Sequence, residues 1–581
     1  MSGVTTMTTV DQNQAEFMDR EFRTLLAEVS NGMSPLELSL ATIDWLSHLS
    51  ISPGKRIRLT QSFFQKLGSL GIYSIQSLVK KDAKGPASAI ERRMTSDEWK
   101  RWPFNVFAQS HQVAKDWVAD ATLGVEGVRD EHEILVHAAA DQILDLLSPA
   151  NYPLTNPEVL KATWEESGRN LGRGLKYFVQ DQIRDVFKNG FAENEEAFTV
   201  GENLAVTPGK VVYQNALIEL IQYSPVTETV AAEPVLISPA WIMKYYILDL
   251  SPKNSLVKYL TEQGKTVFMI SWKNPGAEDK HMGLEDYVKL GIMDALDAVC
   301  TVCPKRKVHA VGYCIGGTLL SMAAAAMARD DDDRLQSLSL FAAQTDFSEA
   351  GEITRFISAS QLSFLEKLMW KRGYLGSENM GGAFSSLRSS DLIYAGIVNR
   401  YFLGKDMALN DLMSWNADGT RMPYQMHTEY LEKLYLNNEL ATNKFHVGGR
   451  VVSISDISVP LFVLGTETDH VAPWKSVYKI LGQTHNELTF ALTSGGHNAG
   501  VVSGPQHPRR RYRLHTRPEG GKYIDADEWM EQEAPIEGSW WPAWDQWLDD
   551  HTSERVDPPA MGASRRGLKP LRDAPGEYVF G

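Results

Sequence analysis

The chain has 581 residues, of which 43% are hydrophobic, and its formal net charge is -15 at pH 7. A chain of this length can bury a large core and is expected to form more than one domain. The acidic balance argues against a nucleic-acid-binding protein, because such proteins normally present a basic face to the phosphates. Three cysteines are too few for a disulfide framework, so we expect a reducing compartment.

Residues 1–195 show helical periodicity and few strand signals. Apolar residues recur three and four positions apart in 15–29 and 35–49, which predicts an α-helical N-terminal domain over 1–195. A glycine pattern at Gly168, Gly172 and Gly174 has no strand before it. Close helix packing is therefore a better interpretation of these glycines than a nucleotide-binding loop.

The sequence predicts neither an export signal nor a membrane span. The N-terminal segment is polar and lacks the apolar core of a secretory signal. The longest apolar stretch, 316–328, is shorter than the roughly 20 residues that a membrane-spanning helix requires. We therefore expect a cytoplasmic protein without a transmembrane segment.

From about residue 200 onward, short β-type runs alternate with helical ones. This alternation predicts an α/β domain over 196–581, with a mostly parallel sheet and helices on both faces. The predicted strands are 210–213, 235–238, 266–271, 308–311, 337–342, 461–464 and 489–492. The strands at 337–342 and 461–464 are separated by far more chain than one crossover helix requires. The surplus predicts an inserted cap at about 346–450.

Cys314 is the most informative residue, because it lies at the centre of a glycine-rich segment, 312–317. An apolar run precedes this segment and small residues follow it, which predicts a strand, a sharp turn and a helix. Glycines two positions either side of a nucleophile relieve a strained turn, as in the nucleophile elbow of the α/β-hydrolases. A thiol here replaces the usual serine and becomes a strong nucleophile when a base takes its proton. The alternative is a small buried cysteine that only packs.

Two further residues follow predicted strands in the order that this fold requires. Asp469 follows the strand 461–464, and His497 follows the strand 489–492. The order nucleophile, acid, histidine is that of the α/β-hydrolases and differs from the orders of the chymotrypsin and subtilisin types. The sequence therefore predicts an α/β-hydrolase fold with a triad of Cys314, Asp469 and His497.

Several other residues compete for these roles. A loop-capping carboxylate is the alternative for Asp469, and its neighbour His470 is better interpreted as structural. His507 lies beside a basic run, 508–513, which either attracts phosphates or forms a solvated arginine face. Cys300 and Cys303 form a lone C-x-x-C, for which core packing is favoured because a redox or zinc site lacks further ligands.

Four tryptophans near the C-terminus are spaced as one face of a helix. We interpret this face as packing onto the α/β domain, with contact to an external hydrophobic surface as the alternative. The residues are Trp540, Trp541, Trp544 and Trp547.

The chain resembles the poly(3-hydroxyalkanoate) synthases, which polymerise (R)-3-hydroxyacyl-CoA and carry a G-x-C-x-G-G box. The resemblance extends over roughly residues 35–580. Besides the box, the similar segments are 156–160, 244–250, 271–275, 415–423 and 469–474. Two places depart from the family pattern: an asparagine follows His497 where many members have isoleucine, and Trp241 stands where some relatives carry a cysteine. Both bear on substrate preference, and neither removes a triad group.

The resemblance implies an acyltransferase that releases CoA and builds a polyester through a covalent cysteinyl ester. His497 would deprotonate Cys314, and Asp469 would either orient the imidazole or help to activate the attacking hydroxyl. The backbone N–H of Ile315 and a donor in the 240–242 loop, assigned to Trp241, would form the oxyanion hole. CoA is part of the substrate and a product, so no separate cofactor and no metal is implied.

Because the chain carries its own helical N-terminal domain, it resembles the self-sufficient class I type, which prefers short-chain monomers such as 3-hydroxybutyryl-CoA. The implied partners are the acyl-CoA, the growing polyester chain, a second copy in a homodimer and the surface of a polymer granule. Aromatic and methionine side chains of the cap would line an acyl channel or simply form the cap core. A cap over the site would also exclude water.

The alternatives to a synthase are a cysteine-type hydrolase, acting as thioesterase or esterase, and a non-catalytic granule-surface protein. The sequence predicts neither the chain length of the preferred monomer nor the CoA-binding residues, the cap opening or the dimer geometry.

Overall fold

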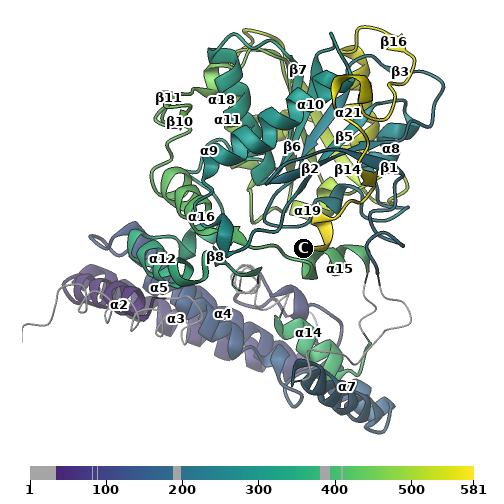
Figure 1. Cartoon of the computed structure of the whole chain (residues 1–581). Helices are drawn as coiled ribbons and strands as arrows, with labels where there is room; N and C mark the ends of the chain where they lie inside the picture. The colour runs from purple at the N-terminus through teal and green to yellow at the C-terminus, as the bar shows by residue number, and fades with distance from the viewer. Residues whose placement is uncertain are drawn as a thin grey trace, which may run out of the picture. The chain divides into compact units, whose positions relative to one another are not determined.

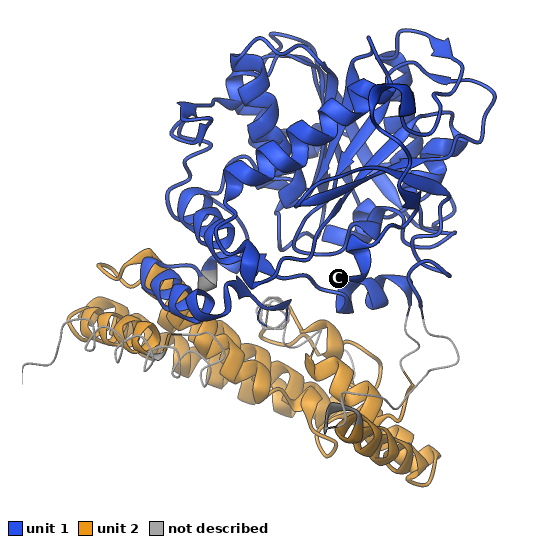
Figure 2. Cartoon of the chain, in the orientation of Figure 1, with its two compact units in different colours: residues 1–29, 198–380, 410–581 blue, residues 30–197, 381–409 orange. Residues whose placement is uncertain are grey.

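The computed structural model describes residues 34–80, 83–87, 89–186, 198–377, 379, 393–406 and 410–581. These residues fall into two compact units, which Figure 2 shows in different colours. The α/β unit takes the described residues of 198–380 and 410–581, and the helical unit takes those of 30–197 and 381–409. The predicted helix over 15–29 lies outside the described residues.

A large mixed sheet forms the centre of the α/β unit (Figure 1). In the described part of the chain its strand order is β15-β14-β13-β12-β7-β6-β4-β5-β2-β1-β17. The central strands are β13 (Leu488–Thr493), β12 (Leu461–Thr466), β7 (Leu335–Phe341), β6 (Val308–Tyr313), β4 (Val235–Ser238) and β5 (Val267–Trp272). The outer strands are β15 (Ile536–Glu537), β14 (Arg511–Arg517), β2 (Ile218–Tyr223), β1 (Gly209–Gln214) and β17 (Arg572–Asp573).

The seven predicted strands correspond to β1 and the six central strands. The central strands pair in parallel, as predicted. The outer strands pair antiparallel, so the prediction of a mostly parallel sheet is wrong for both edges. An antiparallel pair needs only a short turn, whereas a parallel pair needs a crossover, and the short β1–β2 connection leaves no room for one.

Successive residues of a central strand point to opposite faces of the sheet. In β12, Leu461 and Val463 belong to one hydrophobic core, and Phe462 and Leu464 belong to the other. Because helices cover both faces, these strands are apolar throughout instead of alternating. The first core includes residues of α10 (Asp294–Val302) and α11 (Ile315–Arg329), and the second includes residues of α8 (Leu256–Glu262) and α21 (Trp541–Asp550).

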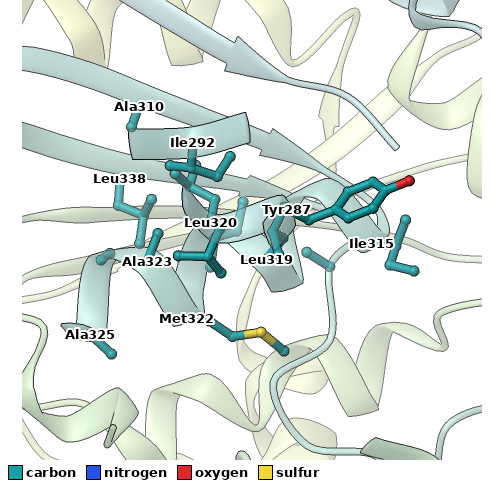
Figure 3. Packing of buried hydrophobic residues seen from close by; sticks show 14 of the residues in the cluster. Tyr287, Ile292, Ala310, Ile315, Leu319, Leu320, Met322, Ala323, Ala325 and Leu338 are labelled. Carbon is teal, nitrogen blue, oxygen red and sulfur yellow. The ribbon is translucent and has the colours of Figure 1, made fainter. Parts of the chain in front are cut away.

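Helix α11 is buried from Ile315 through Met327. Figure 3 shows its Leu319, Leu320 and Ala323 beside Ala310 of β6 and Leu338 of β7. This helix contains the apolar stretch noted in the sequence, which therefore packs against the sheet. Among the helices of the described residues, none combines the length and the apolar character that a membrane crossing needs.

Helix α21 packs its tryptophans into the second core, as the spacing predicts. The four side chains are between 0% and 7% exposed. The ring centroid of Phe341 in β7 lies 4.9 Å from that of Trp540 and 5.0 Å from that of Trp544. Contact of this face with an external hydrophobic surface is therefore wrong, because the face is buried within the unit.

The helical unit contains the elements that the N-terminal periodicity predicts. Side chains cap two of them: the Ser34 hydroxyl accepts from the N–H of Glu37, and the Asn156 side chain accepts from the N–H groups of Glu158 and Val159. The main helices are α2 (Pro35–Ser50), α3 (Pro53–Val79), α4 (Phe104–Thr122), α5 (Asp130–Leu146), α6 (Pro157–Glu165) and α7 (Arg169–Val186).

A segment from inside the predicted cap belongs to this helical unit. Arg400 in η8 (Val398–Phe402) makes a two-pronged ion pair with Asp181 of α7, with N–O distances of 2.6 and 2.9 Å. A Cβ on Gly174 would lie only 1.8 Å from the carbonyl oxygen of Tyr401. Gly174 therefore permits close packing of α7 against Tyr401, in agreement with the packing interpretation of the glycine pattern. Other elements of the predicted cap lie in the α/β unit, among them α12 (Ala359–Arg372), α15 (Asp411–Ala417), α16 (Tyr424–Glu429) and η9 (Tyr430–Leu436).

Asp249 is a buried carboxyl group that follows η3 (Tyr245–Leu248). It accepts hydrogen bonds from the hydroxyl of Ser255, at 2.7 Å, and from the hydroxyl of Thr207. Burial raises the pKa of Asp249 to about 6, although the two hydroxyl groups act to lower it. Below about pH 6 the folded protein therefore favours the protonated acid here.

Replacing Asp249 by Asn is expected to remove a pH-dependent part of the stability. The pKa of an unfolded aspartate is about 3.9, so the folded wild type holds an extra proton between about pH 4 and pH 6. The stabilisation that this proton provides is full below the pKa of the unfolded aspartate and is lost as the pH rises through the pKa of the folded one. Between pH 4 and pH 7 the wild type should lose about 2 kcal/mol relative to Asp249→Asn. Urea unfolding of both proteins across this range measures the difference, and a pH-independent difference would contradict the expectation.

Candidate active site

Cys314 occupies the turn between β6, which ends at Tyr313, and α11, which begins at Ile315. Its backbone has φ 55° and ψ -131°, a conformation that residues with a Cβ rarely adopt. The Cys314 N–H donates to the carbonyl of Phe341 at 2.8 Å, and its carbonyl accepts from the N–H of Gly317 at 2.9 Å. The predicted strand, strained turn and helix are therefore present.

Glycines make this turn possible through close backbone approach. A Cβ on Gly312 would lie 2.3 Å from the Cα of Gly317. A Cβ on Gly316 would lie 2.4 Å from the carbonyl oxygen of Pro239 and 2.5 Å from that of Ser238. No side chain fits in these spaces, so the start of α11 rests directly on the loop that follows β4.

Asp469 and His497 lie on the loops that follow β12 and β13 and are hydrogen-bonded to each other. The distance from His497 Nδ1 to Asp469 Oδ2 is 2.7 Å. The side chain of Asp469 is completely buried, and that of His497 is 10% exposed. Because a carboxylate only accepts hydrogen bonds, His497 carries a proton on Nδ1 and directs Nε2 away from Asp469.

Further hydrogen bonds fix the Asp469 carboxylate. Oδ2 also accepts from the hydroxyl of Thr466 at 2.9 Å, and Oδ1 accepts from the N–H groups of Val471 and Ala472 at 2.8 and 2.9 Å. Burial acts to raise the pKa of Asp469, but the charge of His497 and these hydrogen bonds hold it below its usual value. The acid is therefore ionised and fixed in one orientation.

The three predicted triad residues are electrostatically coupled. Burial acts to lower the pKa of His497, but the charges of Asp469 and Cys314 and the hydrogen bond to Asp469 raise it well above its usual value. The ring of Tyr313, next to Cys314, lies 5.6 Å from the imidazole between centroids. The structure thus brings Cys314, Asp469 and His497 together in one site.

The two predicted oxyanion donors flank the elbow. Ile315 is the first residue of α11, where a backbone N–H has no carbonyl partner within the helix. Trp241 lies in the loop that touches Gly316. Its carbonyl accepts from the hydroxyl of Thr420 at 2.7 Å, and its indole donates to the sulfur of Met426 at 3.1 Å. The loop is held in place, and the use of its backbone donor stays a prediction.

The competing histidines have other surroundings. His507 Nε2 lies 2.7 Å from the side-chain oxygen of Asn254. The carbonyl of His470 accepts from the N–H of Glu352 at 3.2 Å. The carboxylate of Asp469 pairs with His497, as expected, and not with its sequence neighbour.

The basic run 508–513 leads into β14, a strand that the sequence did not predict. Arg511 and Arg513 pair with Glu467 at 2.9 and 2.8 Å. Arg510 donates to the carbonyls of Ser494 and Ala499 at 3.2 and 2.9 Å. These guanidinium groups therefore bind carboxylate and carbonyl groups of the same chain. Strong charge along this segment concealed a strand, because strands are usually recognised by their apolar positions.

Two tyrosines of η9 belong to the surroundings of Cys314, and the sequence reasoning missed them. The hydroxyl oxygens of Tyr430 and Tyr435 are 3.3 Å apart, and Phe347 lies 4.9 Å from Tyr435 between ring centroids. Burial raises the pKa of both phenols, and the charge of Cys314 adds to this effect. Both phenols stay protonated beside the nucleophile. No local signal distinguishes them from the other aromatic residues of the cap.

The remaining cysteines are packed. Cys303 is buried in the first core and Cys300 packs against it. Burial raises the pKa of Cys303 to about 12 and also raises the pKa of Cys300. Within the described ranges, no group of three or more His, Cys, Asp or Glu side chains is arranged to hold a metal ion.

Replacing Gly316 by Ala is expected to destabilise the α/β unit. The new Cβ would lie 2.4 Å from a backbone oxygen, and this oxygen moves only if the loop after β4 moves. Overpacking of this kind costs about 1–3 kcal/mol. Thermal unfolding should show a lower midpoint for Gly316→Ala. Gly482→Ala is the matched control, because its Cβ would meet only a ring carbon of Tyr523 at 3.8 Å. Equal midpoints for the two variants would contradict the expected clash.

Comparison with known proteins gives three family matches. Residues 90–260 match a family described as the poly-beta-hydroxybutyrate polymerase (PhaC) N-terminus, and residues 13–55 match the poly-beta-hydroxybutyrate polymerase N-terminal family. Residues 233–503 match the alpha/beta hydrolase fold, in agreement with the sheet and the elbow described above.

Similar curated proteins cover almost the whole chain. A poly(3-hydroxyalkanoate) polymerase subunit PhaC of Rhizobium meliloti is 36% identical over 93% of this chain and 88% of its own length. A poly(3-hydroxyalkanoate) polymerase of Methylorubrum extorquens is 37% identical over 92% and 88%, respectively. The PhaC subunit of Cupriavidus necator is 31% identical over 92% and 90%. This chain therefore belongs to the poly(3-hydroxyalkanoate) polymerase family.

Proposed function

We propose that this chain is an acyltransferase that polymerises (R)-3-hydroxyacyl-CoA into a polyester and releases CoA. Its relatives are named for this polymerase activity. The observation that carries the proposal is the position of Cys314 in a strained turn, coupled to the hydrogen-bonded pair of His497 and Asp469. A thiol in this position suits substrates that arrive as thioesters, because exchange between two sulfur acyl carriers is nearly balanced in free energy.

In the first step, His497 Nε2 takes the proton of the Cys314 thiol, and the thiolate attacks the thioester carbonyl. The backbone N–H groups of Ile315 and Trp241 would stabilise the oxyanion that forms. The carbon–sulfur bond to CoA then breaks, and the imidazolium returns its proton to the departing CoA thiolate. The products are free CoA and an acyl group held as a cysteinyl thioester.

In the second step, the 3-hydroxyl of another acyl group attacks this cysteinyl thioester. His497 takes the hydroxyl proton as the new carbon–oxygen bond forms, and it returns the proton to the Cys314 sulfur when the carbon–sulfur bond breaks. One oxygen ester is formed and one thioester is consumed, so the chain grows by one unit. Neither step needs a cofactor, because CoA enters with the substrate.

The contacts of Asp469 favour an orienting role over direct activation of the hydroxyl. Both carboxylate oxygens already accept hydrogen bonds, and the side chain is completely buried. A substrate hydroxyl would have to displace one of these donors. Asp469 therefore holds the tautomer of His497 and stabilises its cation.

The proposal includes the assembly expected for a self-sufficient enzyme of this family. The protein acts as a homodimer in the cytoplasm, binds the surface of the polymer granule, and prefers short-chain monomers. Sedimentation of the purified protein with and without a 3-hydroxybutyryl-CoA primer tests the dimer, and initial rates with acyl-CoA substrates of increasing length test the preference.

Replacing Cys314 by Ala is expected to abolish turnover, since no other group in the triad can form the acyl-enzyme. The assay incubates the protein with (R)-3-hydroxybutyryl-CoA and follows free thiol and insoluble polyester together. The wild type should produce both, and Cys314→Ala should produce neither above background. Cys300→Ser is the matched thiol control, because Cys300 lies in α10, outside the proposed site.

Other outcomes of the same assay would contradict the proposal. Thiol release without polymer would indicate a hydrolase of the thioesterase type. Full turnover by Cys314→Ala, or binding to granules without any turnover by the wild type, would indicate a non-catalytic role for the site. Full activity of Cys314→Ser would contradict the argument that sulfur is needed.

Replacing Asp469 by Asn is expected to lower kcat on the order of 10³–10⁴-fold, because the amide can donate to Nδ1 and favours the wrong tautomer of His497. The KM for the acyl-CoA should change little, since the carboxylate does not contact substrate. Thr466→Val, which removes one hydrogen bond to Asp469 but leaves the charge, should have a much smaller effect. Steady-state thiol release measures both constants, and nearly equal kcat for wild type and Asp469→Asn would contradict the orienting role.

A further inference from the structure

His497 is the first residue of α19 (His497–Val501), a helix of five residues. The last four carbonyl groups of any helix have no partner inside it, so almost every carbonyl of α19 depends on outside donors. Such a short helix is also not stable by itself. The groups that bind these carbonyls therefore help to fix the position of the imidazole.

Two tryptophans and an arginine supply such donors in addition to Ser503, whose N–H donates to the carbonyl of Val501 at 3.0 Å and whose hydroxyl donates to that of Ala499 at 2.5 Å. Trp540 Nε1 donates to the carbonyl of Gly500 at 3.1 Å, and Trp541 Nε1 donates to the carbonyl of Val501 at 2.9 Å. Arg510 Nη2 donates to the carbonyl of Ala499 at 2.9 Å. The three donors thus bind three consecutive carbonyls at the C-terminal end of α19, where positive charge is also favourable to the helix dipole.

The donors themselves are fixed. Trp540 and Trp541 are buried, and the Trp541 ring lies 5.5 Å from that of Tyr259 between centroids. The guanidinium of Arg510 also donates to the carbonyl of Ser494, on the other side of His497. Arg510 therefore spans the loop and the helix that flank the imidazole.

The same helix contacts the acid of the pair. A Cβ on Gly500 would lie 2.7 Å from the side chain of Thr466, whose hydroxyl donates to Asp469. The neighbour of the imidazole, Asn498, accepts a hydrogen bond from the Tyr313 hydroxyl at 2.5 Å. A displacement of α19 would therefore move His497 relative to both Asp469 and the elbow.

We propose that Trp540, Trp541 and Arg510 are positioning residues that hold His497 in line with Cys314. They act through backbone carbonyls and do not contact substrate. The proposal rests on the function proposed above, in which His497 is the base for Cys314. It assigns the two indole N–H groups a role that the packing of their rings does not explain.

Trp544 and Trp547, the other two tryptophans of the face buried by α21, are matched controls. Trp544 Nε1 donates to the hydroxyl of Ser339 in β7, away from α19, and the buried Trp547 Nε1 has no hydrogen-bond partner among the described residues. Replacement of any of the four by Phe removes an indole N–H and some ring volume. Only at Trp540 and Trp541 does it also remove a hydrogen bond to a carbonyl of α19. The carbonyl of Gly500 loses its indole donor, whereas that of Val501 keeps the N–H of Ser503.

The experiment measures two quantities for the four Trp→Phe variants of the full-length protein. Small displacements of reacting groups are costly, so Trp540→Phe and Trp541→Phe should each lower kcat about tenfold with little change in KM. The rate of alkylation of Cys314 by iodoacetamide, followed by mass spectrometry of its peptide, should fall in parallel. Trp544→Phe and Trp547→Phe should stay within about twofold of the wild type.

Arg510 tests the same inference through a different donor. Arg510→Ala should lower kcat and the alkylation rate in the same way, and Arg510→Lys should restore part of the loss through a single donor. Arg509→Ala, at an exposed neighbouring position, should have no effect. These variants keep the inference testable if a tryptophan variant fails to fold, which thermal unfolding of each protein would show.

The outcomes separate this inference from the function on which it rests. Equal losses for all four tryptophan variants would show that ring packing alone matters and would overturn the positioning role. If His497→Ala slows alkylation of Cys314 but Trp540→Phe, Trp541→Phe and Arg510→Ala do not, the positioning role fails alone. If His497→Ala leaves alkylation unchanged, the proposed base is wrong as well.

Discussion

The left-handed backbone of Cys314 is the constraint on which the rest of the α/β unit depends. A residue with a Cβ pays about 1–3 kcal/mol in such a conformation and keeps it only when its surroundings leave no alternative. Here the surroundings are a fully buried helix, a strand carbonyl that binds the Cys314 N–H, and glycines that permit backbone contact. The turn raises the thiol above the sheet edge, where groups from other strands reach it.

Parallel pairing explains why residues far apart in the chain meet at that edge. The carboxyl ends of parallel strands point in one direction, so the loops after β6, β12 and β13 lie on the same side of the sheet. Cys314 and Asp469 lie in the first two of these loops, and His497 begins the short helix α19 at the end of the third. The antiparallel edges of the sheet contribute differently. β14 begins beside the loop that follows β13, and Arg510, the residue before β14, donates to the carbonyls of Ser494 and Ala499 on either side of His497.

The sequence predicts the six central strands, because β12 and its neighbours are continuous apolar runs between turn signals, but it misses β2, where the buried Glu219 and Gln222 interrupt the apolar run. It also predicts the triad, because chain order and strand ends restrict each role to one residue. It does not predict β14, whose arginines hide the strand, or the placement of 393–406 in the helical unit. The contact of Gly174 with Tyr401 forms only when two distant segments of the chain pack together, so no local pattern predicts it.

The tryptophan face shows how far a helical pattern can be interpreted. Spacing predicts that Trp540, Trp541, Trp544 and Trp547 share a buried face, and the structure confirms it. Spacing cannot distinguish the two indoles that bind carbonyls of α19 from the one that binds Ser339 or the one without a partner. That distinction depends on the position of α19, the short helix whose carbonyls meet two of these indoles. Burial of a tryptophan in this unit therefore has two separable consequences, apolar packing and the supply of a directed N–H group.

Buried polar and aromatic groups surround the thiol of Cys314, which is itself partly exposed. The His497–Asp469 pair is almost completely buried, and Tyr430, Tyr435 and Phe347 add aromatic surface with two protonated hydroxyls near Cys314. In such a site, fixed hydrogen-bond donors take the place of mobile water in stabilising charge. The acid and base of the pair are thus held rigidly, while the nucleophile stays partly exposed, as attack on an external substrate requires.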